Sequence, residues 1–329
     1  MIDKRLNIAI VAGGDSSENE ISLKSAENIL ASLDLSRYEA RIVEISGLEW
    51  RVMEADGGFW PIDRHDFTWK PNGVTRRFDA VINSIHGRPG ENGVLPAYFE
   101  LIGMPYTGCR SFCSSLTFSK YHCNQFLRQL GVRVADSLLI RQGQAVDAEK
   151  IIDLIHLPCF VKPNNGGSSC GTSRVTQPDE MMPALDRAFQ EDREVIVEGY
   201  LSGTEVTCGL FKTGTDCQVF PITEIVSKNS FFDYEAKYTA GMSDEITPAR
   251  IPTETARSVQ DLSSFIYDVL DCRGVVRMDY ILVEGQPWFL EVNTVPGMSV
   301  HSIIPKQASI AGFSLDKLFS ILITDAMTR

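Results

Sequence analysis

The chain has no long apolar run and no excess of basic residues, and these absences exclude several classes of protein. No apolar segment in its 329 residues approaches the roughly 18 residues that a membrane-spanning helix requires. Its 31 lysines and arginines face 43 aspartates and glutamates, which gives a net charge of −12. Nucleic-acid binding needs clustered basic residues, so we expect neither a nucleic-acid nor a membrane partner. The N-terminal residues show no secretory signal pattern, and we expect a cytoplasmic protein.

Cysteine and histidine lack the spacing of a metal site. The eight cysteines are spread singly through apolar segments, and Cys109 and Cys113 form a lone C-x₃-C pair without a second pair at zinc spacing. The five histidines form no metal pattern either. In a reducing compartment this distribution is typical of free buried thiols rather than of a disulfide or metal framework.

The two common glycine-rich nucleotide motifs, G-x-x-x-x-G-K-[ST] and G-x-G-x-x-G, are also missing. Residues 158–172, P-C-F-V-K-P-N-N-G-G-S-S-C-G-T, offer another way to hold a phosphate. An expected strand delivers Lys162, and the following glycines let backbone N–H groups approach an oxyanion. Ser168 and Ser169 add hydroxyl donors. The pattern indicates a phosphate-covering loop, and a flexible hairpin tip is the alternative.

The most informative segment is a predicted hairpin near the C-terminus. Two apolar, β-branched and aromatic runs at 275–283 and 287–293 flank Glu284-Gly285-Gln286, a short loop that contains glycine. Side chains alternate faces along a strand, so a turn centred on Gly285 places Asp279 opposite Glu291. Two facing carboxylates about 5 Å apart repel each other unless a cation lies between them.

The same register places Arg277 opposite Asn293. Asp279, Glu291 and Asn293 then form the oxygen-only ligand set that Mg²⁺ prefers when it also holds phosphates. A turn shifted by one residue would break this arrangement. The polar residues would in that case be the solvated face of an ordinary hairpin.

Two loops that follow expected strands carry further polar residues. In G-G-D-S-S-E-N-E (13–20), acidic residues including Glu18 suit a cationic group such as an amine, or they only favour a helix N-terminus. In I-H-G-R-P-G-E-N-G (85–93), His86, Arg88 and Glu91 could line a site, or the Gly-Pro-Gly segment could be simple turn chemistry.

A third loop combines aromatic residues with a lysine. Y-E-A-K-Y (234–238) follows Phe231 and Phe232. This composition indicates a lid that closes over a ligand and excludes water, with an exposed loop as the alternative.

Apolar periodicity predicts an α/β protein of two or three domains. We expect strands at 7–12, 38–45, 79–85, 158–163, 194–200, 204–212 and 217–226, and helices at 21–33, 94–102, 119–131, 178–190, 252–270 and from 314. Residues 48–78 contain turn residues and carry no functional pattern.

Together these motifs resemble the D-alanine–D-alanine ligases of the ATP-grasp superfamily over nearly the whole chain. In chain order they are G-G-D-S-S-E-N-E-I-S-L, H-G-R-P-G-E-N-G, P-Y-T-G-C, K-P-N-N-G-G-S-S-C-G, V-E-G-Y-L-S-G-T-E-V-T, F-F-D-Y-E-A-K-Y, R-M-D and E-V-N-T-V-P-G-M-S-V-H-S. The resemblance implies three α/β domains, at 1–108, 109–198 and 199–329, with ATP between the central and C-terminal ones. It also implies a homodimer that joins two D-alanine molecules through an acyl phosphate.

The resemblance further implies roles for the matching residues. Glu18 would hold the first substrate's ammonium in a network with Ser168 and Tyr238, and Ser302 would receive the second substrate's carboxylate. Arg277 and the Gly297 N–H would stabilise the oxyanion. The residues implied for ATP are Lys120, Lys162, Ser168, Ser169, Glu198, Leu201, Glu205 and Lys237. Those implied for two Mg²⁺ ions, with Mn²⁺ as a possible substitute, are Asp279, Glu291 and Asn293.

The sequence departs from the family pattern at Val295, at the N-N-G-G start of the glycine loop and at Gly199. Tyr238 favours an amide product, although ligation of D-alanine to D-lactate or D-serine remains an alternative. A catalytically silent nucleotide-binding protein would be expected to lack Arg277, Glu291 or Asn293, and all three are present. A nicotinamide-dependent dehydrogenase is disfavoured by the missing G-x-G-x-x-G.

Overall fold

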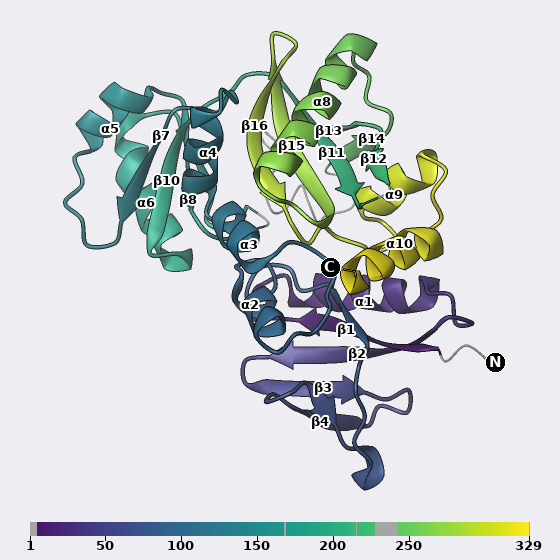
Figure 1. The fold of residues 1–329 in the computed structure, drawn as a ribbon. Coiled ribbons are helices and arrows are strands. Elements are labelled where there is room, and N and C mark those ends of the chain that lie inside the picture. The colour runs from purple at the N-terminus through teal and green to yellow at the C-terminus, as the bar shows by residue number, and fades with distance from the viewer. Residues whose placement is uncertain (1–4, 168, 215, 228–242, 329) are drawn as a thin grey trace.

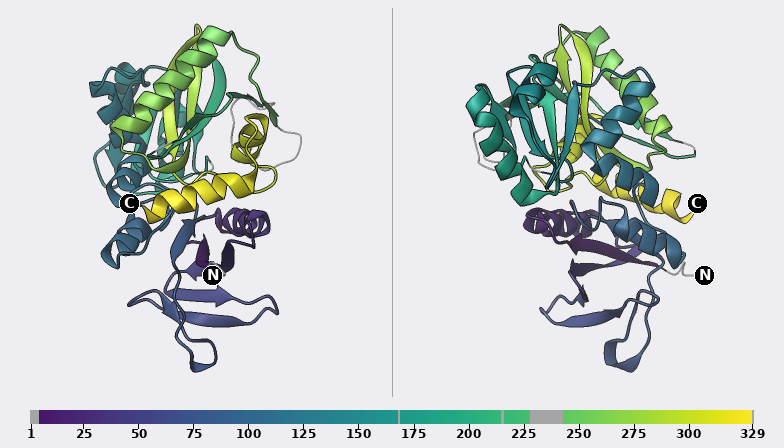
Figure 2. Two further views of the ribbon diagram at one scale, coloured as in Figure 1. Left: turned by 45° about the vertical axis from the view of Figure 1, so that its right-hand side comes forward. Right: turned by 90° about the vertical axis from the view of Figure 1, so that its left-hand side faces the viewer.

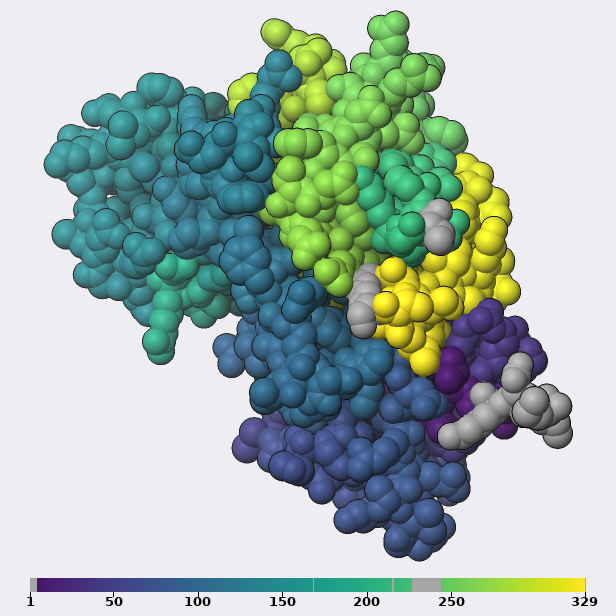
Figure 3. Space-filling model, viewed as in Figure 1, coloured from purple at the N-terminus to yellow at the C-terminus, as the bar shows by residue number. Residues whose placement is uncertain are grey.

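The computed structural model describes residues 5–167, 169–214, 216–227 and 243–328. These residues form three β-sheets with helices packed on them, and the sheets occupy three lobes (Figure 1). The space-filling view shows the same lobes, with the teal one projecting to one side (Figure 3). The expected α/β fold with three sheet-containing parts is confirmed, and the proposed domain boundaries remain a prediction.

The first sheet has six strands in the order β5-β4-β3-β2-β1-β6. β1 lies parallel to β2 and β6, and the strands from β2 to β5 pair antiparallel. Alternate residues of β1 pack against α1 and α10 on one face and near α2 on the other, which explains its apolar run at 8–12. The bounds are β1 Leu6–Gly13, β2 Tyr38–Ser46, β3 Glu49–Met53, β4 Phe59–Asp63, β5 Thr68–Trp69, β6 Ala80–Asn83, α1 Asn19–Ser32, α2 Val94–Leu101 and the 3₁₀ helix η1 Pro71–Gly73.

The elements expected in this part are present. Residues 48–78, where only turn residues stood out, contain β3, β4, β5 and η1. These strands have five residues or fewer, a window too short for apolar periodicity to stand out from the flanking turns.

The second sheet is antiparallel, in the order β7-β10-β8-β9. Its β8 leads into the glycine-rich loop. The sequence did not predict α3, β7 or α5; in α5, Asp147 caps the helix by accepting from the Lys150 N–H. The bounds are α3 Ser111–Phe118, α4 Lys120–Gln129, β7 Ser137–Arg141, α5 Ala148–Ile155, β8 Cys159–Pro163, β9 Ser173–Val175, η2 Pro178–Glu180, α6 Met181–Glu191 and β10 Glu194–Gly199.

The third sheet runs β14-β13-β11-β15-β16, with β12 paired to β11. The single strand expected at 217–226 is wrong: Phe220-Pro221-Ile222 separates β12 from β13. Proline cannot donate to a ladder, which accounts for the break. The bounds are β11 Thr204–Lys212, β12 Cys217–Val219, β13 Thr223–Ser227, β14 Ser243–Ile246, β15 Gly274–Val283, β16 Gln286–Asn293, α8 Thr253–Val269, α9 Ile303–Ile310 and α10 Leu315–Met327.

The two faces of the third sheet differ. Met278, Tyr280 and Phe289 point into a core shared with α8 and α4 and are fully buried. The C-terminal helix α10 packs against β6 and α1 of the first lobe and against β15 of the third (Figure 2). The face of β15 and β16 opposite α8 and α4 lies toward the space between the lobes.

All eight cysteines are free thiols, as expected, and six of them are buried. Although the cysteines are scattered along the sequence, folding brings Cys109, Cys113 and Cys272 together. Among the described residues, no helix is both long enough and apolar enough to span a membrane.

Candidate active site

A cleft of about 1410 Å³ lies between the three lobes. Its walls are the loops that follow β1 and β6, the glycine-rich loop after β8, and the exposed faces of β11, β15 and β16. Of the residues singled out from the sequence, the cleft is lined by Glu18, Lys120, Lys162, Ser169, Glu198, Leu201, Glu205, Arg277, Asp279, Glu291, Asn293, Gly297 and Ser302. Ser168, Lys237 and Tyr238, together with Phe231 and Phe232 of the proposed lid, lie outside the described residues.

The β15–β16 hairpin has the expected facing residues, but its turn and its strand register differ from the expected ones. Asp279 pairs with Glu291, and Arg277 pairs with Asn293. The turn has only two residues, Glu284 and Gly285, both at positive φ, so Gln286 belongs to the strand rather than to the loop.

A bulge between Asp279 and Tyr280 compensates for this shift. Tyr280 pairs with Phe289 and Asp279 with Glu291, so Leu290 is the extra residue. In a regular ladder with the same turn, Leu290 would face Asp279 and Glu291 would point to the core. The bulge therefore turns Glu291 to the same face as Asp279, and both carboxylates line the cleft.

Asp279 is the centre of a polar network on this face. Arg277 donates from Nε to Asp279 Oδ1 and from Nη2 to Oδ2, both at 2.9 Å. Thr207 Oγ1 on β11 donates to Oδ1 at 2.5 Å, and Asn293 Nδ2 donates to Oδ2 at 3.1 Å. Burial lowers the pKa of Arg277, but the charge of Asp279 and these bonds outweigh burial and raise it. Arg277 thus stays cationic beside a fixed carboxylate.

Lys120 connects the hairpin to the glycine-rich loop. Its Nζ lies 3.3 Å from Glu291 Oε2 and donates to the Gly166 carbonyl at 2.5 Å. Lys120 is the first residue of α4, and its backbone N–H donates to the Asn164 carbonyl. Lys120 therefore contacts both the Glu291 carboxylate on β16 and the backbone of the glycine-rich loop.

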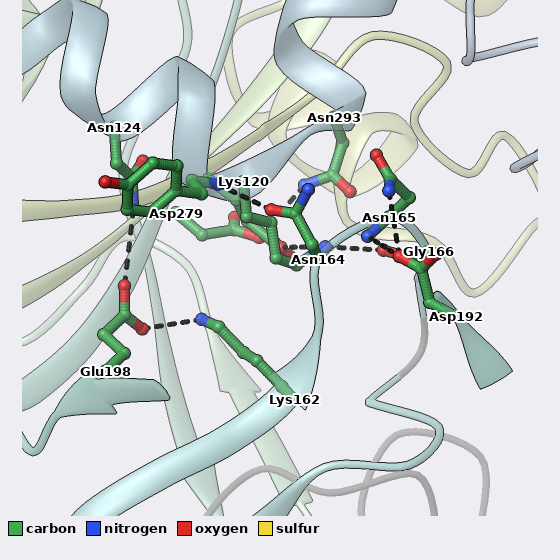
Figure 4. Close-up of polar contacts among 12 residues, drawn as sticks. Lys120, Asn124, Lys162, Asn164, Asn165, Gly166, Asp192, Glu198, Asp279 and Asn293 are labelled. Atoms are coloured by element: carbon green, nitrogen blue, oxygen red, sulfur yellow. Dashed lines mark hydrogen bonds and ion pairs between the residues drawn. The ribbon is translucent and has the colours of Figure 1, made fainter. Parts of the chain in front are cut away.

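Two asparagines anchor the start of the glycine-rich loop (Figure 4). The fully buried Asn164 donates from Nδ2 to Ser119 Oγ and accepts from the Tyr121 N–H at Oδ1. Asn165 donates from its backbone N–H and from Nδ2 to Asp192 Oδ2 at 2.7 and 2.9 Å. The N-N pair that departs from the family pattern thus holds the loop by neutral amides.

Lys162 and Glu198 form an ion pair on neighbouring strands, β8 and β10 (Figure 4). The Nζ–Oε2 distance is 2.6 Å, and Asn124 Nδ2 donates to Glu198 Oε1 at 3.4 Å. Burial lowers the pKa of Lys162, but the charges of Glu198 and Glu291 outweigh it and raise the pKa. The pair presents one fixed cation and one fixed acceptor at the end of the cleft that Leu201 and Glu205 also line.

Glu18 brings the first lobe to the glycine-rich loop. It immediately precedes α1, and a Cβ placed on Gly167 would lie 2.6 Å from Glu18 Oε2. Only glycine therefore fits at position 167 without moving this carboxylate. An acceptor in this position is suited to an ammonium group, as the sequence pattern indicated.

The H-G-R-P-G-E-N-G loop joins the first lobe to the segment after β16. Glu91 accepts from the Gly87 N–H at 2.7 Å and from the Val295 N–H at 3.1 Å, and His86 Nδ1 lies 2.7 Å from the Val295 carbonyl. Burial, with the nearby Glu18 charge, raises the pKa of Glu91 to about 7. Both alternatives for this loop apply in part, because it forms a tight turn and also lines the cleft.

We expect Glu91 to give a pH-dependent contribution to stability. Its folded-state pKa is above the unfolded value, so its stabilising contribution is present below about pH 4.5 and is lost as the pH rises through about 7. Urea unfolding from pH 5 to 8 should show wild type losing about 2 kcal/mol relative to Glu91→Gln.

Glu100→Gln is a control, because the pKa of Glu100 is shifted in the opposite direction from that of Glu91. Burial raises the pKa of Glu100, but hydrogen bonds from Ser111 and Tyr106 outweigh burial and lower it. Wild type should therefore lose stability relative to Glu100→Gln only as the pH falls toward 4. Parallel pH profiles for wild type and Glu91→Gln would contradict the raised pKa.

The segment after β16 ends in a serine pair at the start of α9. Ser299 Oγ and Ser302 Oγ are 2.8 Å apart, and a Cβ on Gly297 would lie 2.8 Å from Ser302 Oγ. The missing side chain at Gly297 keeps its backbone and the serine hydroxyl at the cleft wall. The helix α9, which the sequence did not predict, fixes Ser302 at its N-cap position.

Two residues of the site were missed from the sequence. Thr207, which holds Asp279, lies in the β-branched run of β11, and Asn124, which reaches Glu198, lies in α4. Thr207 is a polar residue within the mostly apolar β11, and nothing in the polar sequence of α4 distinguishes Asn124 from its neighbours. Both depend on pairing between distant elements.

Comparisons with known proteins identify relatives over nearly the whole chain. Models described as the D-ala D-ala ligase N-terminus and C-terminus match residues 7–109 and 126–324. A D-alanine–D-alanine ligase from Phocaeicola vulgatus is 49% identical over 317 residues, covering 96% of this chain and 98% of the relative.

Two solved structures are also similar. A D-Ala:D-Ser ligase from Enterococcus faecalis has a TM-score of 0.87 and 30% identity, covering 98% of this chain and 100% of that one. A D-alanine–D-alanine ligase from Bacillus anthracis complexed with ATP has a TM-score of 0.79 and 26% identity, with 98% of both chains covered. The chain therefore belongs to the D-alanine–D-alanine ligase family.

Proposed function

We propose that this chain joins two D-alanine molecules into D-alanyl-D-alanine at the expense of ATP, and so supplies a precursor for peptidoglycan. The observation that carries the proposal is the facing pair Asp279 and Glu291, directed by the Leu290 bulge toward the glycine-rich loop. Family membership and the names of the relatives support the same reaction.

The donor set on β15 and β16 fits the two magnesium ions that the family implies, because carboxylate and amide oxygens are hard ligands. Asp279, Glu291 and Asn293 would hold them. When bound, magnesium offsets the triphosphate's negative charge during transfer. Mn²⁺ is the expected substitute, since it favours the same ligand types.

The remaining cations and the glycine-rich loop would bind the nucleotide. Lys120 and Lys162 would contact its phosphates, with the Ser169 segment covering them and Lys237 and Ser168 completing the set. Glu198 and the Leu201 backbone would take the adenine, and Glu205 the ribose hydroxyls. The Lys162–Glu198 pair supports this division, since one cation and one buried acceptor lie side by side.

The other end of the cleft would bind the amino acids. Glu18 would hold the ammonium of the first D-alanine, within a network to Ser168 and Tyr238. The carboxylate of the first D-alanine is a poor electrophile. Transfer of a phosphoryl group from ATP to this carboxylate supplies a leaving group. Ser302 would receive the carboxylate of the second D-alanine, whose amine attacks the acyl phosphate.

Attack produces a tetrahedral intermediate with a negatively charged oxygen. Arg277 and the Gly297 N–H would donate to it. The pairing of Arg277 with Asp279 fixes the guanidinium in advance, so little reorganisation is needed when charge develops. An acyl phosphate hydrolyses in water, and the aromatic segment around Tyr238 would close the cleft during both steps.

Phosphate release from ATP tests the proposal most simply. We expect strong stimulation by D-alanine, none by L-alanine, and a D-alanyl-D-alanine product by mass spectrometry. Phosphate release that ignores added D-alanine would reject the assignment.

The alternative function joins D-alanine to a different second substrate, D-serine or D-lactate. The similar Enterococcus faecalis protein is a D-Ala:D-Ser ligase. D-Serine and D-lactate in the same assay, each with D-alanine, would distinguish the products by mass. Tyr238 favours the amide with D-alanine. We also propose that the chain is cytoplasmic and forms a homodimer, and sedimentation of the purified chain would test the dimer.

A further inference from the structure

The close pair Cys109 and Cys113 meets a third thiol, Cys272, from a distant part of the sequence, in the core and away from the cleft. Cys109 precedes α3, Cys113 lies in its first turn, and Cys272 lies between α8 and β15. Their Sγ atoms are all within 4.8 Å of one another, and those of Cys113 and Cys272 are 3.8 Å apart. The three residues are 2%, 2% and 5% exposed, and none of them lines the cleft.

Two glycines make this meeting possible. Gly108 and Gly274 have φ values of +102° and +67°, and a Cβ on Gly274 would lie 2.8 Å from the Gly108 backbone nitrogen. The two backbones are therefore in direct contact, with Cys109 next to one glycine and Cys272 two residues before the other. A side chain at position 274 would push the thiols apart.

The sulfur spacing matches that of a metal–thiolate site. Zinc–sulfur bonds of about 2.3 Å give sulfur–sulfur distances of about 3.8 Å in a tetrahedral site and about 4 Å in a trigonal one. As a thiol, Cys109 Sγ donates to the Arg273 carbonyl at 3.4 Å and accepts from the Arg273 N–H at 3.3 Å, and the N–H bond would also stabilise a thiolate. Cys113 lies in the first turn of a helix, where the dipole also favours an anion.

We propose that Cys109, Cys113 and Cys272 together bind one thiophilic d¹⁰ metal ion. Zn²⁺ represents the divalent ions of this class. Three S–H bonds break, three metal–sulfur bonds form, and three protons pass to solvent, with no change of oxidation state. A divalent ion fits better than a monovalent one, because it leaves less net charge in the core.

The surroundings also set the conditions for binding. Hydrogen bonds with the Cys109 thiol, together with burial, raise the pKa values of Cys113 and Cys272, so the metal-free thiols are neutral. Metal binding therefore weakens as the pH falls. Because the thiols are buried, the ion enters while the chain folds rather than afterwards.

Such an ion would be structural. It would tie α3 to the start of β15, the strand that carries Arg277 and Asp279. The cluster lies outside the proposed reaction, so this inference does not depend on the ligase activity.

Metal content of the full chain tests the proposal. The chain would be produced in cells supplied with zinc, purified without chelators, and analysed by inductively coupled plasma mass spectrometry. We expect about one zinc per chain in wild type and in Cys159→Ala, a control that removes a fully buried thiol elsewhere. Cys113→Ala and Cys272→Ala should each retain less than about a tenth of that zinc.

Cadmium provides a second readout. Protein produced with cadmium should show a thiolate-to-cadmium charge-transfer band in wild type and in Cys159→Ala that is absent from both cluster variants. If a cluster variant fails to fold, wild type alone decides, because thiolate–cadmium absorption requires bound metal. Wild type free of both metals, equal metal in all variants, or a Cys113–Cys272 disulfide in peptide mapping would overturn the proposal.

Discussion

Replacing Glu291 by glutamine is expected to lower kcat by about 10³-fold or more while leaving the fold intact. The amide is nearly isosteric, but it removes one of the two negative charges that face each other across β15 and β16. It also removes the partner of Lys120, whose Nζ lies 3.3 Å from Glu291 Oε2. Phosphate release at saturating D-alanine and magnesium would measure the loss, and thermal unfolding would verify the fold.

Glu284→Gln is the matched control, because Glu284 belongs to the same hairpin but lies in its turn, outside the cleft. It should keep wild-type turnover. Retained activity of Glu291→Gln at saturating magnesium would mean that the ligand set is misplaced.

Replacing Arg277 by lysine should lower kcat by about 10²-fold and affect the second chemical step more than the first. Lysine keeps the charge but cannot make the two parallel bonds from Nε and Nη2 to Asp279, so the donor loses its fixed orientation. The steps separate experimentally: positional isotope exchange in labelled ATP reports reversible phosphorylation of D-alanine, whereas dipeptide formation reports the attack.

Arg273→Lys is the control, since that side chain lies near Asp271 and outside the cleft. Isotope exchange that falls as much as dipeptide formation in Arg277→Lys would argue against an oxyanion role and for a general effect on the site.

The sequence was sufficient for the family and for most long elements, and the hairpin shows why even a correct contact can rest on a wrong local detail. The expected facing of Asp279 and Glu291 is confirmed, yet the turn has two residues and Leu290 forms a bulge. The turn is one residue shorter than expected, and the extra residue Leu290 restores the pairing of Asp279 with Glu291. A bulge is set by strand twist and packing against neighbouring elements, which a local pattern does not contain.

Contacts between distant segments could not be predicted. Thr207 and Asp279 are 72 residues apart, and Cys113 and Cys272 are 159 apart. Local periodicity places each residue on a strand or helix but does not say which elements pair. The short strands β3 to β5 and the eight-residue helices α3 and α9 were missed because so few residues give a weak periodic pattern.

The most direct measurement concerns the facing carboxylates of β15 and β16. Crystals grown with a non-hydrolysable ATP analogue and Mn²⁺ would locate divalent ions by anomalous scattering. We expect ions bound by Asp279, Glu291 and Asn293 beneath the triphosphate, with the glycine-rich loop above it. A nucleotide bound elsewhere, or one bound with no metal at these three side chains, would contradict the proposed function.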